Sequence, residues 1–283
     1  MISLPSVGQR RAGLPSGTSA DSDDSSYVSP SRLNLWLKCP LAYKYRYVDG
    51  IRSPTSAALF LGQRVHAGLE CYYRHRMLGI TTSSEAAVAQ MQRSWESEAD
   101  AQGFKPESVN AEEQLRQQAS QLVEYYIDSI SDDEPRPLAV EAKIEVPLVD
   151  PANGENLGIN LLGVCDLVLP SEDGPVVIDF KTASRSGKPL EISHEIQMTC
   201  YAYLIREVLG VDESAVQIRS LIKTKVPKIA VYQYVARQDY HFRRLFRVIR
   251  EYLDYIDRGV YGYRPSWTCN MCDHRDRCSK WRG

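Results

Sequence analysis

Apolar residues in the first half of the chain recur at helical spacing. Between residues 33 and 41 they lie three or four positions apart, directly after Ser29-Pro30-Ser31, a segment typical of a helix start. The same criterion predicts three further helices, at about 57–77, 84–99 and 111–130. We therefore expect ordered structure to begin at Ser29 and to be mostly helical through the first half of the chain.

The pattern changes to strict alternation at residue 140. Apolar residues from Val140 to Leu148 alternate with Glu141, Lys143 and Glu145, which predicts a strand with one buried face. Turn signals at 153–154 and 172–174 separate this strand from two more, at 157–169 and 176–180, so the three should form a meander. The remaining predicted elements are a helix at about 192–209, strands near 215–223 and 229–235, and a basic amphipathic helix at about 238–258. This order indicates an α/β fold class.

The two ends of the chain differ from the middle. Residues 1–27 are rich in Ser, Gly, Asp and Pro and hold few large apolar side chains, so burial cannot offset the entropy of ordering them. We expect a disordered tail there. Residues 28–283 should form a single domain, with a helical insert at about 80–132, a core at about 138–258 and a Cys-rich tail at 265–283.

Composition and charge narrow the class of protein. Hydrophobic residues make up 43% of the chain, so a sizeable core can be buried, yet no run of eighteen apolar residues predicts a membrane span. Residues 1–26 contain no apolar segment typical of a secretory signal, and we expect a cytoplasmic protein without membrane contact. The net charge of −2 excludes a protein that coats nucleic acid through a global positive field.

Any nucleic-acid contact must therefore come from a local basic surface. Two stretches are candidates: Lys223, Lys225 and Lys228, and then Arg237, Arg243, Arg244, Arg247 and Arg250. Charge runs are often only solvated surfaces, so a charged hairpin and a solvated helix face are the alternatives. Tyrosines beside them could stack on bases or could pack within strands: Tyr232, Tyr234 and Tyr240.

Three residues of the predicted meander carry candidate chemistry. Asp179 and Lys181 are two apart on the third strand and should project from the same face. If the second and third strands pair through the turn at 172–174, Asp166 can lie beside Asp179. Two carboxylates can hold Mg²⁺ or Mn²⁺, and a neighbouring lysine can orient or deprotonate a metal-bound water. A salt bridge at a strand end is the alternative.

Helical residues could add to this group. Gln197 and Tyr201 are four apart on the helix after Lys181 and share a face. They could reach a phosphate or position the lysine, or they could pack on the sheet. His66, on the helix at 57–77, is a possible ligand, although a single histidine on such a helix is more often structural.

Six of the seven cysteines fall into two groups of three. Cys71, Cys165 and Cys200 stand in apolar surroundings and are expected to be small core residues, without structural disulfides. Cys269, Cys272 and Cys278 cluster outside a regular element, which favours metal binding and leaves a fourth ligand open. Zinc or an iron–sulfur cluster would suit this set, and His274 is a competing ligand that would suit zinc better.

The motifs together resemble the RecB-type branch of the PD-(D/E)xK nuclease superfamily. The subgroup with all of them includes CRISPR-associated RecB-like nucleases, AddB-type nuclease domains and related phage or repair exonucleases, and the resemblance spans about residues 29–281. It is carried by Ser29-Pro30-Ser31-Arg32-Leu33 through Cys39-Pro40, Leu61-Gly62-Gln63-Arg64-Val65-His66, Gly163-x-x-Asp166, Ile178-Asp179-Phe180-Lys181-Thr182, Gln197-x-x-x-Tyr201 and the late cysteine trio.

The resemblance implies roles for these residues and a fold. The fold would be a restriction-endonuclease-like core, a mixed sheet flanked by helices. Lys181 would be the catalytic lysine, and Gln197 and Tyr201 would support the site or contact DNA. The implied metal ligands are His66, Asp166, Asp179, the main-chain carbonyl of Phe180 and an acidic residue on the first core strand, where Glu141 and Glu145 compete.

The resemblance also implies a [4Fe–4S] cluster, for which Cys39 would be the fourth ligand beside Cys269, Cys272 and Cys278. This cluster would join the first helix to the tail. The expected function is a Mg²⁺- or Mn²⁺-dependent exonuclease acting on single-stranded DNA or DNA ends. A CRISPR adaptation nuclease that trims spacer precursors with integration proteins, and a non-catalytic DNA-binding adaptor, are the alternatives. No Gly-rich phosphate loop is present, so a recombination or helicase partner would be a separate chain.

Overall fold

A computed structural model describes residues 27–185, 187 and 191–283. Residues 1–26 of the expected tail lie outside the described residues. The prediction that order begins at Ser29 was wrong by two positions, because Tyr27–Val28 forms a short strand, β1, parallel to residues 160–161. Val28 is fully buried, and this burial explains why the pair joins the sheet.

The first half is helical, as predicted. Its helices are α1 (Pro30–Lys38), α2 (Pro40–Tyr43), a π-helical turn η1 (Lys44–Val48), α3 (Ala57–Leu78), α4 (Ser84–Arg93), α5 (Trp95–Ala101) and α6 (Val109–Asp128). The single helix expected at 84–99 is instead two helices, interrupted at Ser94. The Ser94 hydroxyl donates to the Met91 carbonyl and accepts a hydrogen bond from Arg64, and such local bonds compete with helix continuation.

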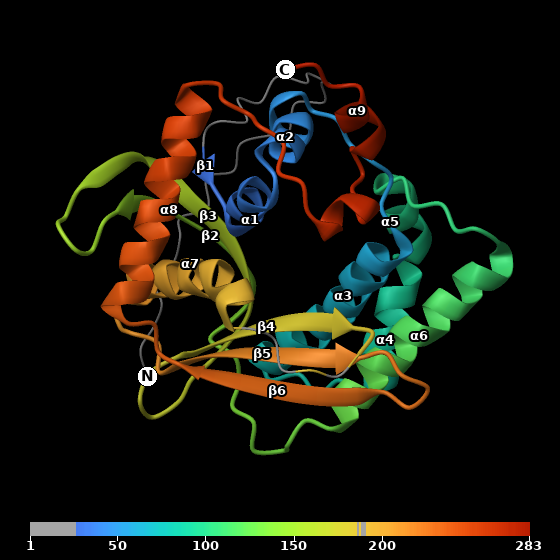
Figure 1. The fold of residues 1–283 in the computed structure, drawn as a ribbon. Coiled ribbons are helices and arrows are strands. Elements are labelled where there is room, and N and C mark those ends of the chain that lie inside the picture. The colour runs from blue at the N-terminus through green and yellow to red at the C-terminus, as the bar shows by residue number, and fades with distance from the viewer. Residues whose placement is uncertain (1–26, 186, 188–190) are drawn as a thin grey trace, which may run out of the picture.

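The second half forms the sheet and its remaining helices (Figure 1). The elements are β2 (Ala139–Val149), β3 (Asn156–Leu169), β4 (Val176–Ala183), α7 (Glu191–Leu209), β5 (Ala215–Ile222), β6 (Lys228–Val235), α8 (Asp239–Asp257), η2 (Trp267–Met271) and α9 (Arg275–Ser279). The sheet order is β1-β3-β4-β5-β6, with β2 also paired to β3. β2, β3 and β4 form the predicted antiparallel meander, whereas β4 and β5 are parallel. The α/β fold with a mixed sheet flanked by helices is confirmed.

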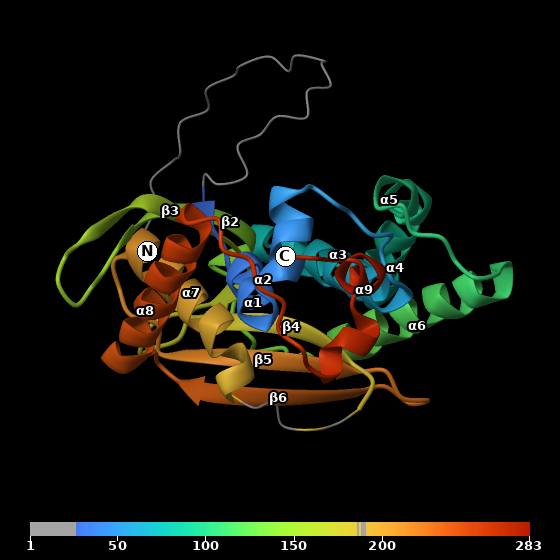
Figure 2. The ribbon, with the colours of Figure 1, turned by 45° about the horizontal axis from the view of Figure 1, so that its top comes forward.

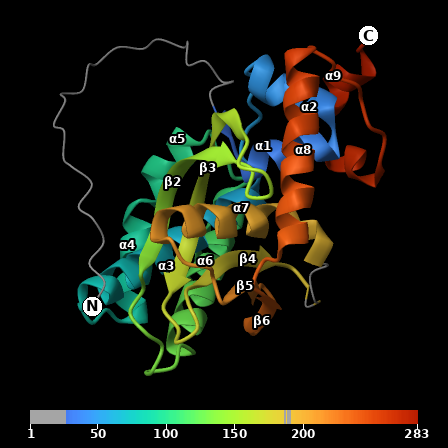
Figure 3. The same ribbon diagram turned by 90° about the vertical axis from the view of Figure 1, so that its left-hand side faces the viewer.

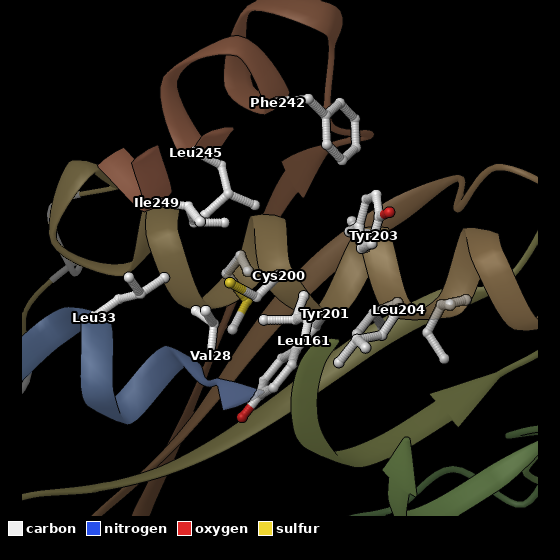
Figure 4. Close-up of a cluster of buried hydrophobic side chains, with 14 of the residues drawn as sticks. Val28, Leu33, Leu161, Cys200, Tyr201, Tyr203, Leu204, Phe242, Leu245 and Ile249 are labelled. Atoms are coloured by element: carbon white, nitrogen blue, oxygen red, sulfur yellow. The ribbon is translucent and has the colours of Figure 1, made fainter. Parts of the chain in front are cut away.

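Each face of the sheet buries its own apolar core. On one face α1, α7 and α8 pack together, and Figure 4 shows Leu33, Cys200 and Leu245 meeting there. Figure 3 shows α7 lying across the strands with α8 standing against it. On the other face α3, α4 and α6 form a second core around Phe180. The C-terminal η2 and α9 share a cavity with residues of α1, α2 and η1, and α9 lies away from the projecting β2–β3 hairpin (Figure 2).

The apolar residues of β2 do not share one face, contrary to the sequence prediction. Val140 packs in the core around Phe180, whereas Ile144, Val146 and Leu148 pack with α1, α7 and α8. The reason is Glu141, whose φ of +43° is left-handed and interrupts the side-chain alternation. β3 changes face at the same level, since Cys165 and Leu167 lie in different cores although they are two residues apart.

Two of the three expected core cysteines, Cys165 and Cys200, are buried. The third prediction was wrong: Cys71 is half-buried and lines a surface pocket between α3 and α4, because it sits on the side of α3 that turns away from the sheet. Among the described residues, no helix is long and apolar enough to cross a membrane.

Candidate active site

The candidate site lies where β3 and β4 separate. The two strands pair only between residues 167–169 and 176–178, so Asp166 and Asp179 begin the diverging ends. β4 stays paired to β5 on its other edge as far as Ala183. The main-chain N–H of Phe180 therefore has no partner on β3 and donates to the Asp166 carboxylate instead, with 2.7 Å between Phe180 N and Asp166 Oδ2.

Helix α3 brings His66 to this fork. A Cβ atom on Gly62 would lie 3.3 Å from the Thr182 hydroxyl, so glycine lets the helix approach the end of β4 closely. His66 Nε2 is 3.1 Å from the Phe180 carbonyl oxygen, and Nδ1 is 3.4 Å from Glu141 Oε1 and 3.7 Å from Asp166 Oδ2. His66, Glu141 and Asp166 each offer a ligand atom within 4.8 Å of the other two.

This arrangement fits a divalent cation. When Nε2–H donates to the Phe180 carbonyl, the Nδ1 lone pair faces two carboxylate oxygens, and three electron-rich atoms then need a cation or a proton between them. Histidines that bind metals commonly donate their other ring N–H to a main-chain carbonyl or a carboxylate. A nitrogen with two carboxylates suits Mn²⁺, and the oxygen ligands suit Mg²⁺.

Asp179 and Lys181 project together, as the two-residue spacing predicts. Lys181 Nζ lies 2.7 Å from Asp179 Oδ2, and Gln197 Nε2 donates to Asp179 Oδ1 at 2.9 Å. Gln197 also donates to the Tyr201 hydroxyl at 2.8 Å. Asp179 is thus held by a lysine and an amide, and it stands beside the group of His66, Glu141 and Asp166 rather than within it.

The buried carboxylates resist ionisation in the absence of a cation. Burial raises the pKa of Asp179 to about 6; Lys181 opposes this shift and Asp166 adds to it. Burial also raises the pKa of Asp166, with His66 acting in the opposite direction. Burial alone would lower the pKa of His66, but Glu141 and Asp166 outweigh it and raise that pKa. Burial disfavours the ionised carboxylates, and the neighbouring negative charges add to this effect; a bound cation would offset both.

The structure separates the two acidic candidates on β2. Strand parity makes Glu141 and Glu145 equivalent, but the left-handed backbone at Glu141 breaks that equivalence. Glu141 reaches His66, whereas Glu145 accepts a hydrogen bond from Asn160 at 2.8 Å. A left-handed non-glycine residue stores backbone strain that is often found at functional sites.

A matched pair of variants tests this distinction. Glu141→Gln is expected to weaken Mn²⁺ binding about tenfold or more, because the ligand group loses a charge. Glu145→Gln should leave the Mn²⁺ dissociation constant unchanged. Titration of both variants by isothermal calorimetry measures the two constants, and equal constants for the two variants would contradict the assignment.

Sequence reasoning missed His194. It lies three residues before Gln197 on α7, so it shares a helix face with that residue. Burial and the charge of Lys181 lower the pKa of His194, while Asp179 raises it, which places the ring within electrostatic reach of both residues. Its spacing from Gln197 on the predicted helix was the available signal.

The four cysteines expected to bind a metal line one cavity of about 510 Å³. Cys39 follows α1, and Cys269, Cys272 and Cys278 lie on the C-terminal segment. Burial raises the pKa of Cys278, and Cys39, Cys272 and Cys269 raise it further, so the four sulfurs are near one another. Within the part of the chain that the structure describes, no three of them lie within 4.8 Å of one another, and His274 completes no such group.

The basic residues of the two stretches differ in burial and in the acidic partners that they already have. Arg237 is 1% exposed and Tyr234 is buried, so the suggestion that they contact nucleic acid was wrong. On α8, ion pairs link Arg244 to Glu195, Arg247 to Glu251, and Arg250 to Asp150. The segment with Lys223, Lys225 and Lys228 begins where β4 ends, since the Lys223 N–H donates to the Ala183 carbonyl, two residues beyond Lys181.

Comparison with models of known protein families identifies one family. The model of the PD-(D/E)XK nuclease superfamily matches residues 27–279. A solved structure of a protein described as "putative exonuclease" from Eubacterium rectale is 13% identical, with a TM-score of 0.53, and the alignment covers 93% of this chain and 94% of that one. For the protein SSO0001 the values are 14% identity, a TM-score of 0.48, and coverage of 92% and 89%. The search of curated proteins finds no match.

Proposed function

The chain belongs to the PD-(D/E)XK nuclease superfamily, and on that basis we propose that it is a metal-dependent exonuclease that hydrolyses phosphodiester bonds of single-stranded DNA or DNA ends. One observation carries the proposal: His66, Glu141 and Asp166 converge within 4.8 Å at the fork of β3 and β4. The ion pair of Lys181 and Asp179, with 2.7 Å between Lys181 Nζ and Asp179 Oδ2, lies beside this group. Metal ligands and a positively charged hydrogen-bond donor are thus neighbours, as phosphodiester hydrolysis requires.

The proposed metal ligands are His66, Glu141 and Asp166, with Asp179 and the Phe180 carbonyl beside them. A bound Mg²⁺ or Mn²⁺ supplies positive charge against the transition state and a more acidic water. Lys181 donates hydrogen bonds to the attacking water or to a phosphate oxygen. Gln197 keeps Asp179 turned toward Lys181, and the Tyr201 hydroxyl keeps Gln197 in place.

DNA would approach along the segment at 223–228. This segment lies beside the ends of β4 and β5, close to Lys181 along the sheet. On α8, by contrast, Arg244, Arg247 and Arg250 already have acidic partners. Charge contacts of this kind bind the phosphate backbone without reading the sequence. This assignment suits an enzyme that degrades DNA of any sequence.

A [4Fe–4S] cluster of the RecB-type subgroup is the second part of the proposal. The cavity of about 510 Å³ lined by all four cysteines has room for a cluster, whose irons separate the thiolates. Four cations also line the cavity, against the single acid Asp273, and they would offset the negative charge of the cluster: Lys38, Arg46, Arg264 and Arg275.

One experiment tests both parts. The protein is purified without oxygen, its iron content and visible spectrum are recorded, and end-labelled single and double strands are digested with Mg²⁺ or Mn²⁺. We expect about four irons per chain, a brown protein and metal-dependent release of nucleotides from DNA ends. Protein that binds Mn²⁺ but leaves both substrates intact would favour a DNA-binding adaptor, and a colourless zinc protein would overturn the cluster.

A further inference from the structure

A buried polar network lies on the far side of β4 from Lys181. Arg219, on β5, donates to Glu134 Oε2 at 2.7 Å and to the Tyr126 hydroxyl at 2.7 Å. Tyr73, on α3, donates to Glu134 Oε1 at 2.8 Å, and its oxygen lies 2.8 Å from that of Tyr126. The network therefore joins α3, α6, β5 and the segment before β2.

The side-chain oxygens of Tyr73, Tyr126 and Glu134 all have partners in the network. Burial raises the pKa of Tyr73 and of Tyr126, so both hydroxyls stay protonated and can donate. The Tyr73 hydroxyl donates its hydrogen bond to Glu134, so the Tyr126 hydroxyl can donate to the Tyr73 oxygen. Arg219 donates to the Tyr126 oxygen and to Glu134. Arg76 also donates to the Glu134 main-chain carbonyl and so ties that segment to α3. Fully satisfied buried networks of this kind are rigid.

The network surrounds one side chain, that of Phe180. The Tyr73 ring stacks on the Phe180 ring with 6.0 Å between centroids, and the Tyr126 ring meets it edge-on at 5.3 Å. Arg219 is the residue paired with Phe180 across β4 and β5. Contacts from a helix on each side and from the neighbouring strand thus fix Phe180.

The main chain of Phe180 in turn holds two residues of the candidate metal site. Its N–H donates to Asp166, and its carbonyl oxygen accepts from His66 Nε2. His66 and Tyr73 are seven residues apart on α3, two turns of one helix face. A rotation of α3 or a shift of β4 would therefore move the network and the ligand atoms together.

We propose that Tyr73, Tyr126, Glu134 and Arg219 are positioning residues, which act through Phe180 to set the geometry of His66 and Asp166 for metal binding. The inference rests on the proposed metal site. Groups that orient metal ligands through hydrogen bonds typically change metal affinity by about 10- to 100-fold when they are removed.

The test compares two arginines that each pair with a glutamate, Arg219 with Glu134 and Arg206 with Glu213. Arg219→Met removes the central donor of the network. Arg206→Met is the control: it removes an ion pair with Glu213, in which Arg206 Nε and Glu213 Oε2 are 2.6 Å apart. Arg206 lies near the end of α7, more than two turns after Gln197. Both variants should melt at lower temperature than the wild type. Only Arg219→Met is expected to bind Mn²⁺ about tenfold or more weakly, measured by the electron paramagnetic resonance of free Mn²⁺.

Cleavage by Arg219→Met should recover at saturating Mn²⁺, because the substitution weakens metal binding and removes no group that touches the metal or the DNA. The inference is overturned if folded Arg219→Met binds Mn²⁺ like the wild type, or if Arg206→Met weakens binding equally. If Arg219→Met does not fold, Tyr73→Phe decides in the same assay, since it removes only the hydroxyl that donates to Glu134. Wild-type protein without Mn²⁺ binding or cleavage would instead reject the proposed function.

Discussion

Asp166→Asn is expected to lower the rate of DNA cleavage about 10³-fold or more, because it removes a charged ligand from the group that would hold the cation. The fold should survive, since the asparagine oxygen can still accept the hydrogen bond from the Phe180 N–H. Cleavage of end-labelled DNA at fixed Mg²⁺ measures the rate. The variant should also bind the cation more weakly, and thermal unfolding with added Mn²⁺ should then show less stabilisation than in the wild type.

The same variant should be more stable than the wild type when no metal is present. Burial raises the pKa of Asp166 above the unfolded value, so the folded protein binds the proton more tightly than the unfolded chain. Stability therefore falls as the pH rises through the interval between the two pKa values, and at neutral pH the ionised carboxylate is a cost. Asparagine removes that cost, and differential scanning calorimetry in a chelator should show a higher melting temperature.

Asp150→Asn is the matched control. Asp150 is also buried, but it accepts a hydrogen bond from the Ala152 N–H and pairs with Arg250 far from the fork. This variant should be less stable than the wild type and should cleave DNA at an unchanged rate. Cleavage by Asp166→Asn within tenfold of the wild type would contradict the proposed metal site.

The order of helices and strands could be predicted because burial imposes its period on the sequence. The pattern from Val140 to Leu148 identified β2 correctly but gave it the wrong faces, since alternation assumes an extended backbone at every residue. The backbone at Glu141 is left-handed, and a glutamate in a strand pattern does not predict such a conformation. The break at Ser94 was equally hidden, because the Arg64 guanidinium that stabilises it comes from another helix.

The site was predicted in part for a similar reason. The spacing of Asp179 and Lys181 follows from strand geometry, so their pairing was foreseeable. The fork that frees the Phe180 N–H for Asp166 depends on where β3 stops pairing with β4, which is a tertiary property. The network of Arg219 and Tyr73 was out of reach as well, because its members come from segments distant in sequence and none belongs to a motif.

The C-terminal segment, residues 265–283, has few apolar contacts of its own. η2 and α9 contain no buried residues, so apolar burial can hold this segment only weakly. Just before it, the Leu41 N–H donates to the Gly262 carbonyl and Arg264 donates to the Leu37 carbonyl. Within the segment, the buried His274 packs its ring against Tyr45 with 5.5 Å between the ring centroids. The four cysteines of the shared cavity can further fasten residues 265–283 to α1. A small segment without a core commonly depends on a bound metal for its order.

Cys278→Ser is therefore expected to lose its iron and to release the segment from α1. A cross-link between Cys39 and the late cysteines closes a very long loop and stabilises by about 5.5 kcal/mol in the chain-entropy model, so the melting temperature should fall by roughly 10 °C. Iron analysis, calorimetry and limited proteolysis within 265–283 measure the three effects. Cys71→Ser, at a half-buried cysteine outside the cavity, should keep iron and resist the protease. An iron-free Cys278→Ser that melts with the wild type and resists cleavage would contradict this expectation and show that other contacts hold the segment.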